Sequence, residues 1–294
     1  GALSNLNFPS AKMGPFNDLS FRMTRSALGV DYEMRGHSLD GSKIGHNGAG
    51  NGAAGAGPRK DEMPEGPFHI NARLDRLALR DGVAITPFAL DVSGIGNRPA
   101  NLTLSGNLSR TAPISASMDV SGGARRLTLT AGDAGALAHG LFGFTSMKGG
   151  KLTLTATLPG KASDPDTAPG IPDYQGRLTV NDFMVVNQPF LSRLFSAGSL
   201  TGIADLMQGE GISFEKMDVP FSSKNNVLSV HDAIAHGRAI GATADGYIDR
   251  PKNVIALKGS LVPAYGLNSM LGVIPVLGDL LVSKKGEGIF GVTY

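Results

Sequence analysis

The stretch Pro67-Phe-His-Ile-Asn-Ala-Arg-Leu-Asp75 decides the fold class of this chain. Its apolar residues Phe68, Ile70 and Leu74 alternate with polar ones, and a period of two residues indicates a β-strand with one apolar face. Runs of the same kind follow up to residue 120, spaced roughly 10–14 residues apart and separated by short turns. Connections this short favour antiparallel pairing, because a parallel crossover needs a dozen or more residues.

Alternating runs recur on both sides of this stretch, from Leu3 to Tyr294. We expect a mainly β protein of about 14 strands in one long, twisted antiparallel sheet. A sheet of this length must curl or split, so we expect it to form a groove or an incomplete barrel. Roughly two to four short helices are expected, near the C-terminal part.

Composition divides the chain into two regions. Residues 1–172 are predicted to form an antiparallel β-sheet region, interrupted at 40–66 by a Gly-rich segment typical of a flexible linker or a long hairpin loop. Residues 173–294 are predicted to contain a strand, a helical segment, a β-meander, an apolar loop and a last strand.

Two helices are visible as patterns. Asp133 precedes an apolar run that ends at Phe142, which predicts a short helix with Asp133 as its N-cap. A helical segment at 189–208 could form core over the sheet, a lid at one end of a groove, or a contact with a membrane or partner. Its apolar stripe contains Leu191, Leu194, Phe195, Ile203 and Met207.

The loop at 261–282 is apolar and almost uncharged, and such a surface is rarely exposed in a monomer. This loop could pack on the open end of the sheet, or it could dock to a membrane or a membrane protein. Together with the stripe at 189–208, this loop supplies the predicted cap or docking surface. Its candidate residues are Leu267, Leu271, Ile274, Leu277 and Leu280.

Composition also excludes several function classes. The net charge of +2 provides no field that attracts nucleic acid. The chain has no cysteine, and its six histidines do not form a zinc motif such as H-E-x-x-H. No G-x-S-x-G nucleophile motif occurs either. We therefore expect no catalytic residue, metal or cofactor, and we predict that the pair Arg125-Arg126 is solvated.

The second region contains a series of short motifs in a fixed order. They are Gly176-Arg-Leu-Thr-Val-Asn-Asp-Phe183, Phe190-Leu-Ser-Arg-Leu-Phe195, Ser199-Leu-Thr-Gly-Ile203, Gly209-Glu-Gly-Ile-Ser-Phe214, Gly237-Arg-Ala-Ile-Gly241, Gly246-Tyr-Ile-Asp249, Val262-Pro-Ala-Tyr-Gly-Leu-Asn268, Ile274-Pro-Val-Leu-Gly278 and Gly286-Glu-Gly-Ile-Phe290. In order and spacing this series resembles the C-terminal region of the AsmA-like family, the bridge-like intermembrane lipid transfer proteins that include AsmA, TamB and YhdP.

The resemblance implies a Gram-negative envelope protein that extends through the periplasm. It implies an anchor in the inner membrane, through a segment absent from this chain, and a β-sheet groove lined with apolar side chains. The implied role is to move or guide phospholipid between the inner and outer membranes, and so to maintain the outer membrane. The implied partners are phospholipid or another acyl-chain lipid, a membrane reached through the full-length protein, and a membrane protein.

Two functions are therefore open. In the first, apolar residues of the regular strands line a groove for acyl chains. In the second, the apolar face is fully packed, and the apolar C-terminal loop or an edge strand recruits a protein partner in a structural or assembly role. The groove candidates are Phe68, Ile70, Leu74, Phe88, Leu90, Val92, Leu102, Leu104, Ile114 and Met118.

Overall fold

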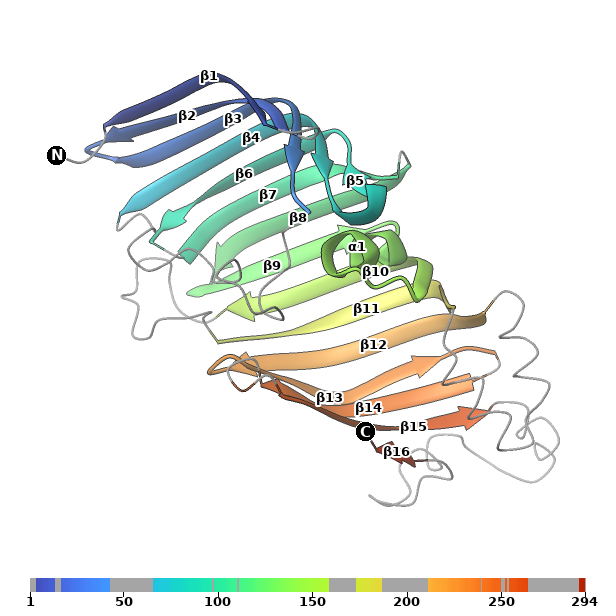
Figure 1. The fold of residues 1–294 in the computed structure, drawn as a ribbon. Coiled ribbons are helices and arrows are strands. Elements are labelled where there is room, and N and C mark those ends of the chain that lie inside the picture. Colours follow the sequence, from blue (N-terminus) through green and yellow to red (C-terminus); the bar gives the residue numbers. More distant parts are fainter. Residues whose placement is uncertain are drawn as a thin grey trace.

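The structure is a computed structural model. It describes residues 4–13, 17–42, 66–96, 98–109, 111–158, 173–186, 211–238, 240–249, 252, 254–263 and 291–293. Within these residues the chain is mainly β, as the alternating runs predict, and sixteen strands form one sheet. Figure 1 shows the strands following one another across the sheet in chain order.

The described part of the first region contains ten strands, and the last of them ends at Leu158. They are β1 (Asn5–Met13), β2 (Asn17–Ser26), β3 (Gly29–Asp40), β4 (Pro67–Ala78), β5 (Ala84–Ile85), β6 (Phe88–Ile95), β7 (Arg98–Leu108), β8 (Ala112–Ser121), β9 (Ala124–Ala131) and β10 (Met147–Leu158). The strands of the second region are β11 (Tyr174–Val185), β12 (Ile212–Lys224), β13 (Val227–His236), β14 (Ile240–Asp249), β15 (Val254–Pro263) and β16 (Gly291–Thr293). The boundary at residue 172 falls between β10 and β11, which pair directly, so the sheet continues across it.

One strand pair departs from the antiparallel prediction. β3 and β4 pair in parallel, from Val30 opposite Phe68 to Asp40 opposite Ala78. The Gly-rich segment at 40–66 joins these strands, so it is not the hairpin loop that its composition allowed. A hairpin would have reversed the direction of β4. The other pairs in the described sheet are antiparallel.

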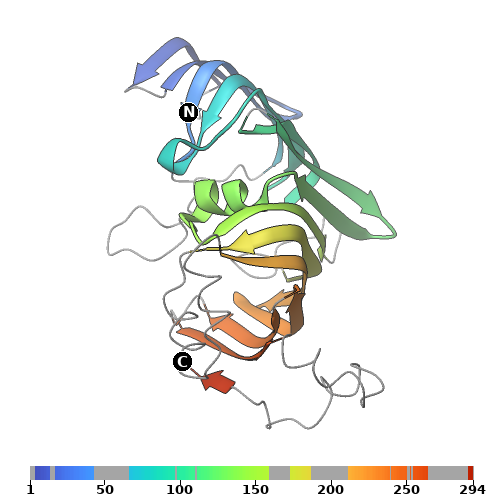
Figure 2. The same ribbon diagram turned by 90° about the vertical axis from the view of Figure 1, so that its right-hand side faces the viewer.

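A single α-helix occurs in the part of the chain that the structure describes, so the predicted helix count is not reached there. Helix α1 (Ala134–Phe142) begins where predicted, and the Asp133 carboxylate accepts a hydrogen bond of 2.8 Å from the backbone N–H of Ala136. It lies on one face of the sheet beside β10 (Figures 1 and 2). The 3-10 turn η1 (Arg80–Gly82) contacts the helix.

Close packing seats α1 against the sheet. A Cβ atom built on Gly135 would lie 2.5 Å from the backbone oxygen of Met147 in β10, so only glycine permits this approach. Leu137 of α1 belongs to a core cluster that draws on β4 to β9, and Ala134 belongs to a second cluster from β11, β12 and β14. The helix therefore covers the place where the two clusters of the sheet meet.

Candidate functional site

An apolar row crosses nearly the whole sheet. Strand register places one uncharged residue from each of fourteen strands opposite the next, without a break. We call this the first apolar row: Leu6, Met23, Tyr32, Ile70, Val92, Leu102, Met118, Leu127, Ala156, Gly176, Phe221, Val230, Gly246 and Leu257. At a strand spacing of about 4.8 Å, the row is about 60 Å long.

A second apolar row runs beside the first on the same face, two residues along each strand. It consists of Phe8, Phe21, Met34, Ala72, Leu90, Leu104, Ala116, Leu129, Leu154, Leu178 and Val219. Most members of both rows are only partly buried, and Phe8 is 48% exposed. Ala72, Met118 and Ala156 are buried, and Leu90, Leu104 and Leu129 flank the core cluster to which Ala72 belongs. The two rows together form the open part of the apolar face.

The same face continues toward α1, where it is closed. Leu74, Phe88, Leu108, Ile114 and Ala131 are buried together with Leu137 of the helix. We call these six residues the covered patch. This patch lies on the same side of the same strands as the two rows. The strand pattern therefore does not distinguish the covered patch from the open rows; coverage by α1 and the neighbouring turn does.

The ten groove candidates all lie on this face, but they divide between its two parts. Phe68, Ile70, Leu90, Val92, Leu102 and Leu104 are partly buried and flank one another across β4, β6 and β7. Leu74, Phe88 and Ile114 belong to the covered patch, and Met118 is buried within the first row. These four residues are packed against the protein itself, so only six of the ten line the open part.

The predicted cap or docking surface lies outside the described residues. This holds for the stripe at 189–208, with Leu191, Leu194, Phe195, Ile203 and Met207, and for the loop positions Leu267, Leu271, Ile274, Leu277 and Leu280. Among the described residues, no helix is long and apolar enough to cross a membrane.

Sequence reasoning missed the C-terminal half of the open part. Leu127, Leu129, Leu154 and Leu178 continue the rows across β9, β10 and β11. The signal was present, because each residue belongs to an alternating run such as Lys151-Leu-Thr-Leu-Thr155. Only the register, which aligns these leucines with Met118 and Leu104, shows that they extend the same surface.

The opposite face of the sheet is polar and carries cross-strand ion pairs. Glu33 of β3 pairs with Arg22 of β2 at 3.6 Å and with Arg35 of its own strand at 2.5 Å. The Arg35 hydrogen bond lowers the pKa of the Glu33 carboxyl. The Asp91 carboxylate of β6 accepts a hydrogen bond of 2.7 Å from the side-chain amide of Asn71. It also contacts the His69 ring at 3.1 Å. Both contacts lower the pKa of the Asp91 carboxyl, and the hydrogen bond from Asn71 has the larger effect.

The pair Arg125-Arg126 divides between the two faces. Arg126 is exposed on the polar face, as predicted. Arg125 is 0% exposed, and its Nη1 donates a hydrogen bond of 3.3 Å to the carbonyl oxygen of Pro99. The prediction that Arg125 is solvated is therefore wrong. A period of two residues sends adjacent side chains to opposite faces, and this rule could have separated them.

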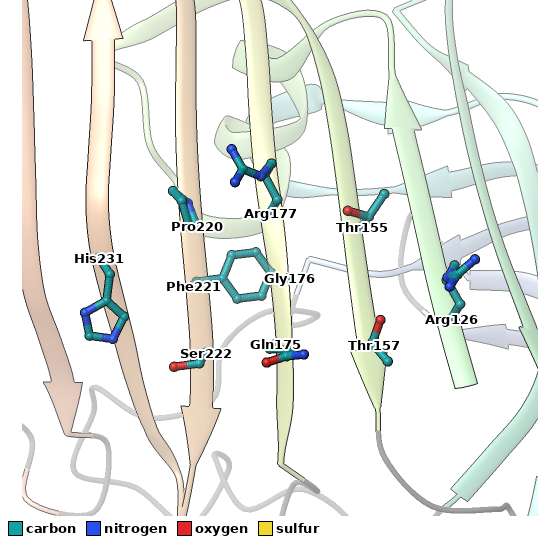
Figure 3. Close-up of a pocket in the computed structure, with 10 residues that line it drawn as sticks. All are labelled: Arg126, Thr155, Thr157, Gln175, Gly176, Arg177, Pro220, Phe221, Ser222 and His231. Carbon is teal, nitrogen blue, oxygen red and sulfur yellow. The ribbon is translucent and has the colours of Figure 1, made fainter. Parts of the chain in front are cut away.

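A shallow hollow of about 660 Å³ opens on the polar face of β9 to β13 (Figure 3). It is lined by Arg126, Thr155, Thr157, Gln175, Gly176, Arg177, Pro220, Phe221, Ser222 and His231. Arg177 is held at one side, where its Nη1 lies 2.8 and 2.7 Å from the two carboxylate oxygens of Asp218. We call this the polar-face hollow.

Several histidines in the described part of the chain pair with carboxylates, and His69 contacts two of them, Asp31 and Asp91. His37 contacts Asp75, and His139 of α1 lies 2.9 Å from Asp81 in η1. No group of three or more histidine and carboxylate side chains suited to a metal ion occurs among the described residues. The site with the largest extent is therefore the apolar face.

Comparison with known proteins identifies no relative: no family model, curated protein or solved structure matches the chain. The AsmA-like resemblance therefore stays a prediction from the sequence.

Proposed function

We propose that the open part of the apolar face binds the acyl chains of phospholipid or a related lipid, without catalysis. The first apolar row is the single observation that supports this function most. Its members are mostly half-buried, and a continuous apolar surface that stays partly open to solvent can mark a binding surface. Acyl chains suit it because apolar contact needs no directional partner, and burial contributes about 25 cal/mol per Å².

In this proposal the sheet curls so that the two rows line a groove, with the covered patch along one side. The strands twist progressively from β1 to β15 (Figure 2), and such twist brings the edges of a long sheet out of plane. A row of about 60 Å is several times longer than the width of one acyl chain. The groove would therefore guide lipid along the row as well as hold it.

The proposal extends to the setting that the family resemblance implies. The chain would be a module of an AsmA-like envelope protein on the periplasmic side. It would take part in phospholipid transport between the inner and outer membranes, and the full-length protein would supply the membrane attachment. The stripe at 189–208 and the loop at 261–282 would form the cap or docking end of the groove.

A matched pair of double variants tests lipid binding. Leu90 and Leu104 lie directly opposite each other on the open part, whereas Ala89 and Ser105 lie opposite each other on the polar face of the same strands. Leu90→Asp with Leu104→Asp introduces two charges into the groove. Ala89→Asp with Ser105→Asp introduces the same two charges and the same cross-strand repulsion outside it.

Each protein is purified from a Gram-negative host, and its phospholipid content is measured by mass spectrometry after extraction. We expect the wild-type chain and the control to carry phospholipid, and the Leu90/Leu104 variant to carry less by more than about fivefold. Circular dichroism checks that both variants fold. Lipid-free wild-type protein, or equal lipid in the two variants, would count against the proposal.

One observation favours a second candidate, a structural or assembly role. Strand β1, nine residues long, pairs with β2 on one side, and no other described strand pairs with its outer edge. An open edge of this length can accept a strand from a partner by β-augmentation. Lipid-free wild-type protein that captures a partner, with capture lost on substituting a proline into β1, would favour this role.

A further inference from the structure

The polar-face hollow has a composition that the lipid-binding proposal does not use. Its lining side chains come from five neighbouring strands and include two guanidinium groups, three hydroxyls, one amide and one imidazole, with no carboxylate among them. Figure 3 shows Arg126 and Arg177 on strands that flank Thr155 and Thr157 of β10. The sheet thus presents hydrogen-bond donors from both sides of a shared depression.

Register brings these donors together. Arg126 lies opposite Thr157, which lies opposite Gln175, and Thr155 lies opposite Arg177. The two arginines are therefore two strand spacings apart across the sheet and two residues apart along it, about 12 Å in all, with the β10 hydroxyls between them. Long side chains at this separation can converge on one small group above Thr155 and Thr157.

Charge in and around the hollow favours an anion. Carboxylates lie at neighbouring positions: Asp218 is bonded to Arg177 and lies 4.0 Å from Lys216, and Asp119 lies opposite Arg126 in β8. Asp218 is thus paired with Arg177, whereas Asp119 is only the cross-strand neighbour of Arg126. In the part of the chain that the structure describes, no carboxylate pairs with Arg126.

Donors also remain on Arg177. Its contact with Asp218 uses Nη1 alone, and a guanidinium group carries five N–H donors. Guanidinium forks match the oxygens of phosphate groups, and threonine and serine hydroxyls donate to the same oxygens. We propose that the polar-face hollow binds a phosphate group, carried either by a small soluble phosphate ester or by a lipid headgroup.

The polar residues Arg126, Thr157 and Arg177 alternate along their strands with members of the first apolar row, so they lie on the opposite side of the sheet. Gly176 and Phe221 of that row also line the hollow. A lipid with its acyl chains in the groove cannot place its own headgroup in the hollow, because the sheet lies between them. Arg126→Gln on the polar face and the Leu90/Leu104 double variant on the apolar face therefore test the two sites separately.

Isothermal titration calorimetry of the whole chain with glycerol 3-phosphate tests the site, with glycerol as the uncharged control. Arg126→Gln removes the exposed guanidinium, and Thr157→Val removes a hydroxyl while keeping a β-branched side chain that suits the strand. Lys12→Gln makes the same charge change as Arg126→Gln at the far edge of the sheet, where Lys12 pairs with Asp18.

We expect wild-type and Lys12→Gln proteins to bind glycerol 3-phosphate with equal affinity, and Arg126→Gln to bind about fivefold more weakly. Thr157→Val should weaken binding to a smaller extent, and glycerol should not bind. Binding should weaken as salt rises, because the site is exposed. No binding by the wild-type chain, or equal binding by Arg126→Gln, would overturn the proposal.

Vesicle flotation separates the two sources of phosphate. Phosphatidylglycerol vesicles that retain the wild-type chain but not Arg126→Gln would assign the site to a lipid headgroup. Binding of glycerol 3-phosphate without vesicle retention would assign it to a soluble ester. If Arg126→Gln floats with vesicles as well as the wild type and also binds glycerol 3-phosphate equally, the hollow is not a phosphate site.

Discussion

The covered patch and the two open rows lie on the same face of the same strands, yet they differ in burial. Leu108 is 0% exposed and packs with Leu137 of α1, whereas Leu104, four residues earlier in β7, is only partly buried. Both residues continue one alternating run. Alternation therefore assigns a residue to a face, and the position of α1 decides whether that part of the face becomes core or surface.

This difference assigns separate tasks to the two parts. Covered residues gain their stability from contacts within the protein, so substitutions there should affect folding. Residues in the open rows leave apolar area exposed to solvent, so substitutions there should affect lipid binding more than folding. Variants in the two parts test this separation, and the largest effect is expected in the covered patch.

Leu108→Ala should lower the free energy of unfolding by about 3 kcal/mol, because it leaves a cavity in the covered patch. Leu104→Ala, the matched change in the second apolar row, should cost about 1 kcal/mol. Urea unfolding followed by circular dichroism measures both. Equal losses would show that the face is packed alike throughout, and the separation into covered and open parts would be wrong.

Gly135→Ala should lower the free energy of unfolding by about 2 kcal/mol, even though alanine favours helix. The added methyl would lie 2.5 Å from the Met147 oxygen, so α1 must move away from β10. Ala136→Ser on the same helix serves as the control, with an expected loss below about 0.5 kcal/mol. A Gly135→Ala variant as stable as the wild type would mean that α1 is not seated closely on the sheet.

Asp133→Ala should cost about 1 kcal/mol, because the backbone N–H of Ala136 loses its capping acceptor. Asp133→Asn keeps an acceptor at the same place and should cost less. The same thermal or urea unfolding experiment measures the two variants. Equal losses would show that the charge of Asp133, rather than its cap hydrogen bond, is what matters.

The polar face should contribute the smallest effect. The pKa of Asp91 is lowered in the folded state, so the ionised carboxylate stabilises the fold above its ordinary pKa of about 3.9, and this contribution is lost as pH falls through the folded-state value. Because Asp91 is partly exposed, the contribution should be below about 1 kcal/mol. Asp91→Asn should therefore lose slightly less stability than the wild type between pH 6 and pH 3.

Asn71→Ala should reproduce this flatter pH dependence, because Asn71 donates the hydrogen bond that lowers the pKa most. Urea unfolding at the two pH values compares the three proteins. A variant that loses more stability in acid than the wild type would reverse the sign of the expected effect.

Much of the fold could be predicted because strand alternation is a local property. The runs around Ile70, Leu104 and Leu154 each identify a strand and its apolar side. The capped helix at Asp133 could be predicted for the same reason. The parallel pairing of β3 with β4 could not be predicted, because the faces of both strands are satisfied in either direction. The connection at 40–66 is also long enough to allow either direction.

The candidate site was predictable only in part. The ten groove candidates share one face, as their alternation requires, but the burial of Leu74, Phe88 and Ile114 depends on tertiary contacts with other strands and with α1. The polar-face hollow could not be predicted at all. Arg126 and Arg177 are far apart in the sequence, and only the pairing of β9, β10 and β11 brings them to one place.

The most direct test of the central claim uses the absence of cysteine from the chain. Single-cysteine variants Leu104→Cys and Ser105→Cys place a bimane fluorophore on neighbouring residues of β7 that face opposite sides of the sheet. Phospholipid with brominated acyl chains is then added, since bromine quenches only fluorophores that it contacts. We predict strong quenching at residue 104 and little at residue 105; equal quenching at both, or none at residue 104, would contradict a lipid-binding apolar face.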